Sequence, residues 1–106
     1  MAIDYNGGMY RIKRTDEFAA WLDGLRDHQA KARLIRRLER AARGNLGDVR
    51  SIGHGVFAMR EHFGPGWRMY YAQCGNALIV MLGGGDKSTQ ATDIAKAIEL
   101  AQRLEE

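Results

Sequence analysis

The spacing of apolar residues changes from a helical to a strand period near the middle of the chain, and this change most constrains the fold. Between residues 15 and 43, apolar side chains recur three and four positions apart, as on one face of a helix. Between residues 49 and 85 they form short runs, rich in branched and aromatic residues and separated by glycines. Residues 90–104 return to a helical spacing. The order predicts an α+β fold, with helices and strands largely segregated along the chain.

The first half is expected to form a strand followed by an N-terminal helical hairpin. Residues 9–14 alternate well enough between polar and apolar side chains for a first strand, and Thr15 is a favourable helix N-cap. Asp27 is placed to cap a second helix, which Gly44 is expected to end. Each helix carries one apolar stripe, so each has one face to bury.

The second half is expected to form a sheet and a final helix. Strands are predicted at residues 49–52, 56–63, 67–74 and 77–84, and the glycine-containing turns between them are typical of hairpins. Residues 78–82 are apolar at both parities, as expected of a central strand covered on both faces. We therefore expect a mostly antiparallel sheet of about four strands, with the helices on one face and a C-terminal helix over residues 90–104.

Length and composition predict one small domain without covalent cross-links. The 106 residues are 45% apolar and include one cysteine, Cys74, which cannot form an intramolecular disulfide and fits the reducing cytoplasm. The longest apolar run, residues 77–82, is far shorter than the ~20 residues of a membrane span. Residues 1–8 lack the features of a secretion signal. We expect a cytoplasmic protein without a membrane partner, with residues 1–8 as a flexible extension and residues 9–106 as the domain.

Basic residues are concentrated in the second expected helix. The chain has 16 Lys and Arg against 13 Asp and Glu, a net charge of +3, and most of the excess lies in residues 26–43. A polyanion such as nucleic acid, or an acidic protein segment, is therefore a candidate partner. A solvated helix face that uses Arg as a good helix former explains the same pattern without a partner.

Two arginines, a histidine and a tyrosine are expected to gather on one face of two neighbouring strands. Residues two apart in a strand share a face, so Arg60 and His62 point the same way. The tight turn at residues 64–66 then brings Arg68 and Tyr70 opposite them. An arginine pair without carboxylate partners suits a phosphate, because the guanidinium fork matches phosphate oxygens. Alternatively, Arg60 and Arg68 edge an exposed sheet or pair with the acidic C-terminal helix.

A glycine-rich segment, Gly-Gly-Gly-Asp-Lys-Ser at residues 83–88, follows an apolar strand and precedes a helix. Its spacing does not match a phosphate-binding Walker loop, and no strand-helix-strand crossover surrounds it. The glycines allow a ligand to approach the backbone closely and place Lys87 at the edge of the sheet. A flexible turn with Ser88 or Thr89 as a helix cap is an equally good interpretation.

Other catalytic arrangements have no support in the sequence. His28, His54 and His62 lack metal-ligand spacing with one another. Ser51 and Ser88 lie in no nucleophile elbow. We therefore expect neither a metal nor a cofactor.

Three segments of the chain together resemble the RelE/ParE toxin superfamily. They are Arg-Thr-Asp-Glu-Phe with Trp-Leu at residues 14–22, Gly-Pro-Gly-Trp-Arg-Met-Tyr-Tyr at 64–71, and Gly-Gly-Asp-Lys-Ser-Thr-Gln with Asp-Ile at 84–94. They are most similar to the HigB-like branch, the addiction module killer proteins. The resemblance covers residues 9–104, and the expected order of elements is the one for which that superfamily is known.

The resemblance implies a type II toxin that cleaves messenger RNA on the ribosome without a metal and inhibits translation until an antitoxin binds it. Arg60, Arg68 and Lys87 are then expected to neutralise charge while a ribose 2′-OH attacks the adjacent phosphate. His62 is the candidate for proton transfer, because an unperturbed imidazole titrates near neutral pH. Asp93 stands where better-known RelE toxins carry a tyrosine in the last helix and joins the candidate catalytic residues, while the identity of the general acid stays open.

The resemblance also implies partners. The basic helix is expected to contact ribosomal RNA phosphates through Arg33, Arg36, Arg37, Arg40 and Arg43. A cognate antitoxin of the helix-turn-helix DNA-binding type is expected to cover the sheet face with one of its segments. The ParE branch shares the fold but inhibits DNA gyrase without nuclease chemistry, so gyrase is the alternative partner. A non-toxic binding module or a decayed toxin is a third interpretation.

Overall fold

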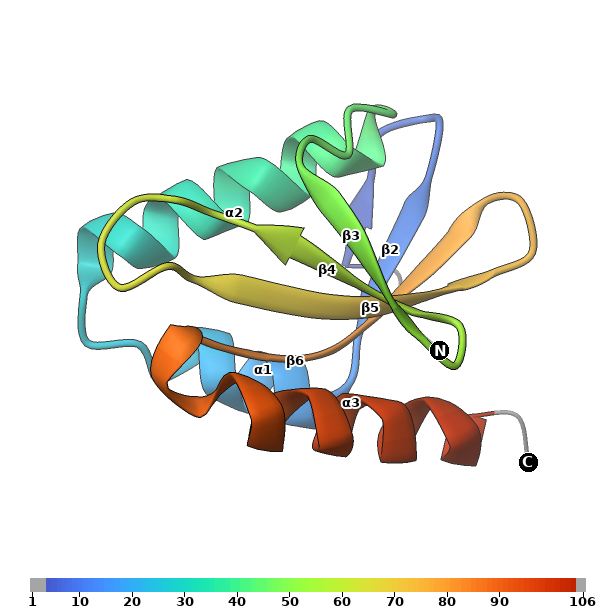
Figure 1. The fold of residues 1–106 in the computed structure, drawn as a ribbon. Coiled ribbons are helices and arrows are strands. Elements are labelled where there is room, and N and C mark those ends of the chain that lie inside the picture. Colours follow the sequence, from blue (N-terminus) through green and yellow to red (C-terminus); the bar gives the residue numbers. More distant parts are fainter. Residues whose placement is uncertain (1–3, 105–106) are drawn as a thin grey trace.

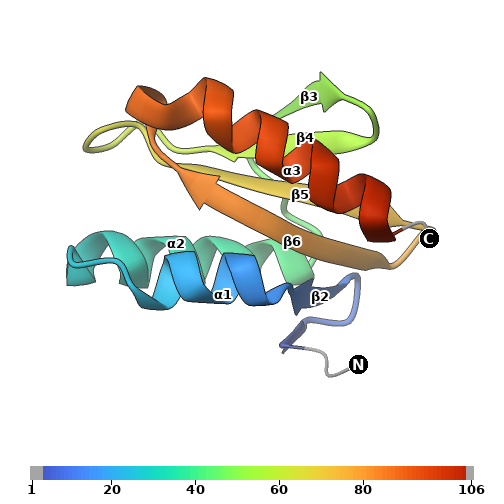
Figure 2. The ribbon, with the colours of Figure 1, turned by 90° about the horizontal axis from the view of Figure 1, so that it is seen from below.

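A six-stranded sheet lies between two layers of helices in the computed structural model, which describes residues 4–104. The strands are β1 (Tyr5–Asn6), β2 (Arg11–Arg14), β3 (Val49–Gly53), β4 (Val56–Arg60), β5 (Arg68–Cys74) and β6 (Leu78–Gly85). The helices are α1 (Asp16–Asp23), α2 (His28–Ala42), the short 3₁₀ helix η1 (Lys87–Thr89) and α3 (Gln90–Leu104). In Figure 1 the strands cross the centre of the molecule, and in Figure 2 α1 and α2 lie on one side of them and α3 on the other.

The sheet differs from the expected one of about four mostly antiparallel strands, and that expectation is wrong. The strand order is β1-β2-β6-β5-β4-β3, and β2 pairs with β6 in parallel, with Lys13 opposite Val80. The other neighbouring strands are antiparallel, so the sheet is mixed. β1 has two residues, too few for an alternating pattern, and alternation within β2 does not reveal the direction in which it pairs.

The first two helices cover the sheet rather than forming the expected hairpin. α1 packs chiefly against β6 and β2, and α2 against β1 and β2. The buried side chains of both helices, among them Phe18 of α1 and Leu38 of α2, belong to one core cluster with Met81 of β6. Each helix has a single apolar stripe that faces the strands, so both helices lie on the same face of the sheet.

The helices cover both faces of the sheet, so the expectation that they pack on one face is also wrong. α3 buries Ala97 and Ala101 against Tyr70, Val80 and Leu82 on the face opposite α1 and α2. Covering both faces requires strands that are apolar at both parities, and β5 and β6 meet this requirement. The prediction of a central strand over residues 78–82 that is covered on both faces is confirmed.

The ends of the helices agree with the sequence. The side chain of Thr15 accepts a hydrogen bond from the Phe18 N–H, and that of Asp27 accepts one from the Ala30 N–H, so both predicted N-caps are confirmed. Gly44 follows the end of α2 with φ +106°, a conformation that favours glycine.

Two further sequence predictions concern the N-terminal extension and the membrane. Residues 1–3 of the expected extension lie outside the described residues, and Tyr5 and Asn6 within it form β1. Among residues 4–104, no helix combines the length and the apolar character needed to cross a bilayer.

Candidate functional site

Arg60 and Arg68 lie directly opposite each other at one end of the sheet, so the prediction that Arg68 comes alongside Arg60 is confirmed. Tyr70 lies opposite Ala58 and not opposite Arg60 or His62, so that part of the expected register is wrong. Arg60 is the last residue of β4 and Arg68 the first of β5. Directly opposed residues point to the same face, here the face covered by α3. Both side chains line a pocket of about 510 Å³ together with Arg50, Ser51, Ile52, Ala58, Gln90 and Ile94. We call this the arginine pocket.

Arg68 is a buried cation without an ion pair to any residue that the structure describes. The residue is 5% exposed, and its Nη1 donates to the carbonyl oxygens of Glu61 and Trp67, each at 3.0 Å. Within residues 4–104, Nε has no hydrogen-bond partner and the guanidinium forms no salt bridge with a carboxylate. A buried charge that is not neutralised stabilises an anion beside it, so Arg68 favours anion binding in the arginine pocket.

Asp48 joins Arg60 to His62 and was missed by the sequence analysis. Its Oδ1 accepts hydrogen bonds from Nη2 and Nε of Arg60 at 2.9 and 3.3 Å, and its Oδ2 lies 2.7 Å from Nε2 of His62. The hydrogen bond from Arg60, followed by that from His62, holds the pKa of the Asp48 carboxyl below its usual range. No periodicity marks Asp48, because it lies in the loop before β3.

Arg37 of α2 holds the loop that carries Asp48. Its Nη2 donates to the carbonyl oxygens of Leu46 and Asp48, at 3.0 and 2.8 Å. Its Nη1 donates to the carbonyl oxygen of Arg60 at 2.6 Å and pairs with the Glu61 carboxylate. Arg37 is therefore buried and bonded inside the protein, unlike the other arginines predicted to contact RNA.

The remaining arginines of that set form an exposed basic face on α2. Arg33, Arg36, Arg40 and Arg43 follow one another at spacings of three and four residues, which places them on one side of the helix. The guanidinium of Arg33 lies over the ring of Phe63, with Cζ 3.7 Å from the centroid. Phe63 directly follows His62, so one end of this basic face lies beside the loop between β4 and β5.

Lys87 lies at the same end of the sheet but outside the arginine pocket. It is exposed at the start of η1, where the Asp86 side chain caps the turn by accepting from the Ser88 N–H at 2.8 Å. Its side chain lies over Gly66, where a β-carbon would come within 2.9 Å of Cε. Gly66 has φ +80° and lies in the turn that connects β4 with β5. Lys87 therefore borders the turn that brings Arg60 and Arg68 together.

Asp93 lies on the far side of Arg68 from Arg60. Its Oδ2 accepts a hydrogen bond from Thr89 Oγ1 at 2.6 Å and occupies the space that a side chain at Gly85 would need. Gly85 is the cross-strand partner of Arg68 on β6. Burial, and then the negative charge of Asp93, raise the pKa of the Tyr70 hydroxyl to about 12.

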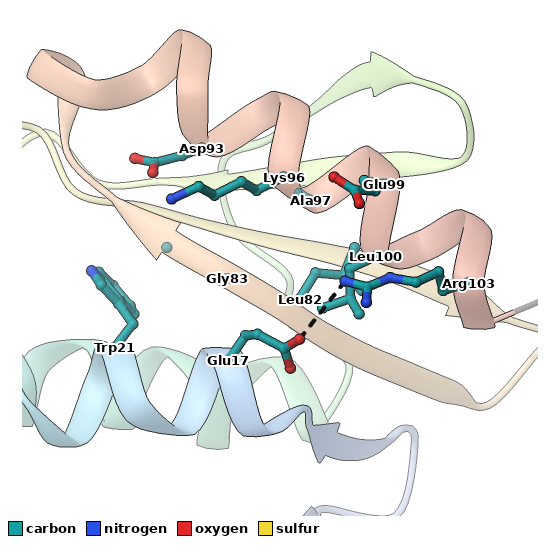
Figure 3. A pocket seen from close by; sticks show the side chains of 11 residues that line it. Glu17, Trp21, Leu82, Gly83, Asp93, Lys96, Ala97, Glu99, Leu100 and Arg103 are labelled. Atoms are coloured by element: carbon teal, nitrogen blue, oxygen red, sulfur yellow. Dashed lines mark ion pairs between the residues drawn. The ribbon is translucent and has the colours of Figure 1, made fainter.

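A second pocket, of about 420 Å³, lies between α1 and α3 beside β6 (Figure 3). Glu17 and Trp21 reach it from α1, and Asp93 borders it from α3. Its charged lining residues are Glu17, Asp93, Lys96, Glu99 and Arg103, and Arg103 lies 4.0 Å from Glu17. Because acidic and basic groups are mixed here, this pocket suits a polyanion less well than the arginine pocket does.

The predicted catalytic residues are thus only partly brought together. Arg60 and Arg68 share a pocket, His62 is linked to Arg60 through Asp48, and Lys87 and Asp93 border the same end of the sheet. Arg60 is paired with the Asp48 carboxylate, so the expectation of an arginine pair without carboxylate partners is wrong for Arg60, and Arg68 supplies the uncompensated charge of the pair. The His62 imidazole is 67% exposed and can exchange protons with a ligand at the rim. In the described part of the chain, no group of three or more His, Cys, Asp or Glu side chains could hold a metal ion.

Comparison with known proteins gives two matches. The family model described as "Phage derived protein Gp49-like (DUF891)" matches residues 20–106. An uncharacterized protein of Haemophilus influenzae is 43% identical to this chain over 94 residues, which are 89% of this chain and 95% of that protein. No solved structure matches the chain at a significant level.

Proposed function

Because the chain belongs to the phage-derived Gp49-like family (DUF891), a family of type II toxin–antitoxin toxins related to the RelE-like toxins, we propose that it is an endoribonuclease that cleaves messenger RNA on the ribosome. Membership in a toxin–antitoxin family implies a cognate antitoxin as a partner. We further propose that, among the RelE-related toxins, this chain belongs to the HigB-like branch. The Gly-Gly-Asp-Lys-Ser-Thr-Gln segment at residues 84–90 supports this assignment.

The buried Arg68 beside Arg60 in the arginine pocket is the observation that supports cleavage most directly. A scissile phosphate bound there receives charge-assisted hydrogen bonds from both guanidinium groups. As the ribose 2′-oxygen attacks phosphorus, negative charge builds on the phosphate oxygens, and cations that are already in place stabilise it without rearrangement. Arg68 is held by two backbone carbonyl groups, so it is such a cation.

The proposed reaction moves two protons and exchanges two bonds. A base removes the 2′-OH proton while the 2′-oxygen bonds to phosphorus, the bond from phosphorus to the 5′-oxygen breaks, and an acid protonates that leaving oxygen. The products carry a 2′,3′-cyclic phosphate and a 5′-OH. We assign proton transfer to His62 and charge neutralisation at the rim to Lys87. Asp93 is kept as a candidate for the second proton-transfer group, next to Arg68.

Contacts with the ribosome are assigned to the exposed basic face of α2. Arg33, Arg36, Arg40 and Arg43 are available to RNA phosphates, and Arg37 supports them from inside by fixing the neighbouring loop. Binding through several phosphate contacts weakens steeply with salt, because each contact releases counterions. The proposed antitoxin, of the helix-turn-helix DNA-binding type, inhibits cleavage by covering the end of the sheet that carries the arginine pocket.

Overexpression in bacteria tests this function. Wild type and Arg68→Ala are induced, translation and replication are followed by pulse labelling, and the 5′ ends of a long-lived messenger RNA are mapped. Removal of a preorganised charge-stabilising donor costs ~10²–10³-fold in rate, so wild type is expected to cut within the reading frame and the variant is not. Arg11→Ala is the matched control, because Arg11 is an exposed strand arginine at the opposite side of the sheet. Arrested replication with intact messenger RNA would instead place the protein with the gyrase inhibitors.

A further inference from the structure

We propose that Asp48 is a positioning residue that holds Arg60 and His62 in fixed orientations at the arginine pocket. The inference rests on the proposed function for its catalytic consequence, and on the contacts of one carboxylate for its geometry. Asp48 uses one oxygen for each partner: Oδ1 accepts from Arg60 and Oδ2 contacts His62. A single side chain thereby links the group assigned to phosphate binding with the group assigned to proton transfer.

The contact with Arg60 fixes the plane of its guanidinium. Two nitrogens, Nε and Nη2, donate to the same carboxylate oxygen, at 3.3 and 2.9 Å. A planar guanidinium with two donors on one oxygen has little freedom to rotate. Its third nitrogen, Nη1, has no partner among residues 4–104 and remains available to an anion in the arginine pocket.

The contact with His62 selects one state of an otherwise exposed ring. His62 lies beyond the end of β4, and its side chain is 67% exposed, so the sheet itself does not orient it. When Nε2 carries the proton and donates it to Asp48 Oδ2, Nδ1 is left free to accept a proton from a substrate. A carboxylate that selects the tautomer of a catalytic histidine is an established way to increase its efficiency as a base.

The backbone of Asp48 is fixed strongly enough for the carboxylate to act as a support. Its carbonyl oxygen accepts hydrogen bonds from Arg37 Nη2 at 2.8 Å and from the Arg60 N–H at 2.9 Å. Arg37 is buried and also bonds the carbonyl oxygen of Arg60. The position of Asp48 relative to β4 is therefore set by the protein core and not by the ion pair alone.

An alternative role for Asp48 is an ordinary surface ion pair. Asp48 is itself partly exposed, and exposed ion pairs contribute little to stability. The two roles therefore make different predictions: a surface ion pair predicts that Asp48→Asn changes neither cleavage nor the state of His62, and a positioning residue predicts that both change while stability is retained. Asp4→Asn is a matched control, because Asp4 also accepts from an arginine, Arg14, on a strand remote from the pocket.

The test combines a cleavage assay with nuclear magnetic resonance of the histidine ring. Cleavage is measured across pH on ribosomes programmed with a defined messenger RNA, and the ring nitrogens of ¹⁵N-labelled protein report the tautomer of His62. Asp48→Asn is expected to lower the cleavage rate ~100-fold, as misplacement of a reacting group does, and to change the shape of the pH profile. The His62 ring is expected to pass from one tautomer to a mixture, with Asp4→Asn unchanged in both measurements.

Failure of this inference can be distinguished from failure of the proposed function. If wild type cleaves and Asp48→Asn cleaves equally well with the same pH profile, Asp48 is not a positioning residue and the nuclease proposal stands. If wild type does not cleave, the nuclease proposal fails, and the tautomer measurement alone decides whether Asp48 orients His62. An identical His62 spectrum in wild type and Asp48→Asn overturns the inference in either case.

Discussion

The surroundings of two buried arginines, Arg37 on α2 and Arg68 on β5, differ in how their charges are satisfied. The two residues are similarly buried, at 4% and 5% exposure, and in both Nε is without a partner among the described residues. Arg37 donates to three carbonyl oxygens and pairs with the carboxylate of Glu61. Arg68 donates to two carbonyl oxygens and has no carboxylate partner within residues 4–104.

The difference separates a structural cation from a binding cation. A buried charge that is paired and bonded to the backbone ties elements together, as Arg37 ties α2 to the loop before β3 and to the end of β4. A buried cation that has no carboxylate partner and lies beside a pocket can bind an anion there. Sequence position alone does not distinguish them, since both are arginines in segments with an expected role in RNA binding.

The largest effect is expected from Arg37→Met. The change leaves the Glu61 carboxylate and the carbonyl oxygens of Leu46 and Asp48 without their donor, and breaking a buried pair in this way costs ~3–5 kcal/mol. Denaturant unfolding of wild type and Arg37→Met measures the difference in the free energy of unfolding. Arg36→Met is the control, because Arg36 is exposed on the same helix and its replacement is expected to change stability by no more than ~0.5 kcal/mol.

Arg68→Met supplies the other half of the comparison. Here no carboxylate among the described residues loses its partner, so Arg68→Met is expected to destabilise the protein less than Arg37→Met does, by a difference of at least ~2 kcal/mol in the free energy of unfolding. Cleavage is expected to be lost. The same unfolding measurement and the 5′-end mapping described above give both values. Equal destabilisation by the two substitutions would show that Arg68 is as structural as Arg37.

A smaller effect is expected from Gly84→Ala, which tests whether the close packing of Trp21 against β6, next to the Arg68 pair with Gly85, requires a glycine. A β-carbon at Gly84 would clash with the Trp21 ring, which cannot bend away as a long flexible side chain can, and overpacking of this kind costs ~1–3 kcal/mol. Gly83→Ala is the control, because a β-carbon at Gly83 meets no atom within 4 Å. Thermal unfolding of both variants makes the measurement, and equal melting temperatures would contradict the prediction.

The smallest effect is expected from Tyr70→Phe, next to Arg68 on the same face. The Tyr70 hydroxyl is buried and has no hydrogen-bond partner among the described residues, so its removal is expected to leave stability unchanged or raise it by ~1 kcal/mol. Denaturant unfolding at pH 7 measures this change. A loss of more than ~1 kcal/mol would mean that the hydroxyl has a stabilising partner in solution.

Alkaline pH gives the same residue a second test. The pKa of Tyr70 is raised from 10.0 to about 12, chiefly by burial, so the folded protein retains a proton that the unfolded chain releases. The resulting stability is fully present below pH 10 and is lost as the pH rises through about 12. Unfolding measured across this range is expected to show a shallower decline in Tyr70→Phe than in wild type.

Much of the fold was predictable because hydrophobic periodicity reports local structure. Thr15 and Asp27 cap helices where their side chains suggest it, and α3 has the predicted bounds. The parallel pairing of β2 with β6 was not predictable, because alternation shows which residues share a face and not which strand lies beside them. β1 was missed since its two residues are too few to show a period.

The candidate site was predictable where it depends on strand register and not where it depends on loops. Arg60 and Arg68 meet because β4 and β5 are antiparallel neighbours, connected by residues 61–67. Asp48 was missed because its place is set by hydrogen bonds from Arg37, a tertiary contact that no local pattern records. For the same reason Arg37 could not be told apart from its exposed neighbours on α2 without the structure.

The parallel pairing of β2 with β6 also determines how early the sheet can form while the chain is being synthesised. Residues 11–14 find their partner only at residues 78–81, after both N-terminal helices and strands β3 to β5 have been made, whereas β3, β4 and β5 pair with strands directly adjacent in sequence. Long-range pairing forms late because the connecting chain must first be ordered. Gln90 and Ile94, which close the arginine pocket, follow later still. A growing chain therefore has an incomplete anion pocket until residues 90–94 have been made and have folded onto the sheet.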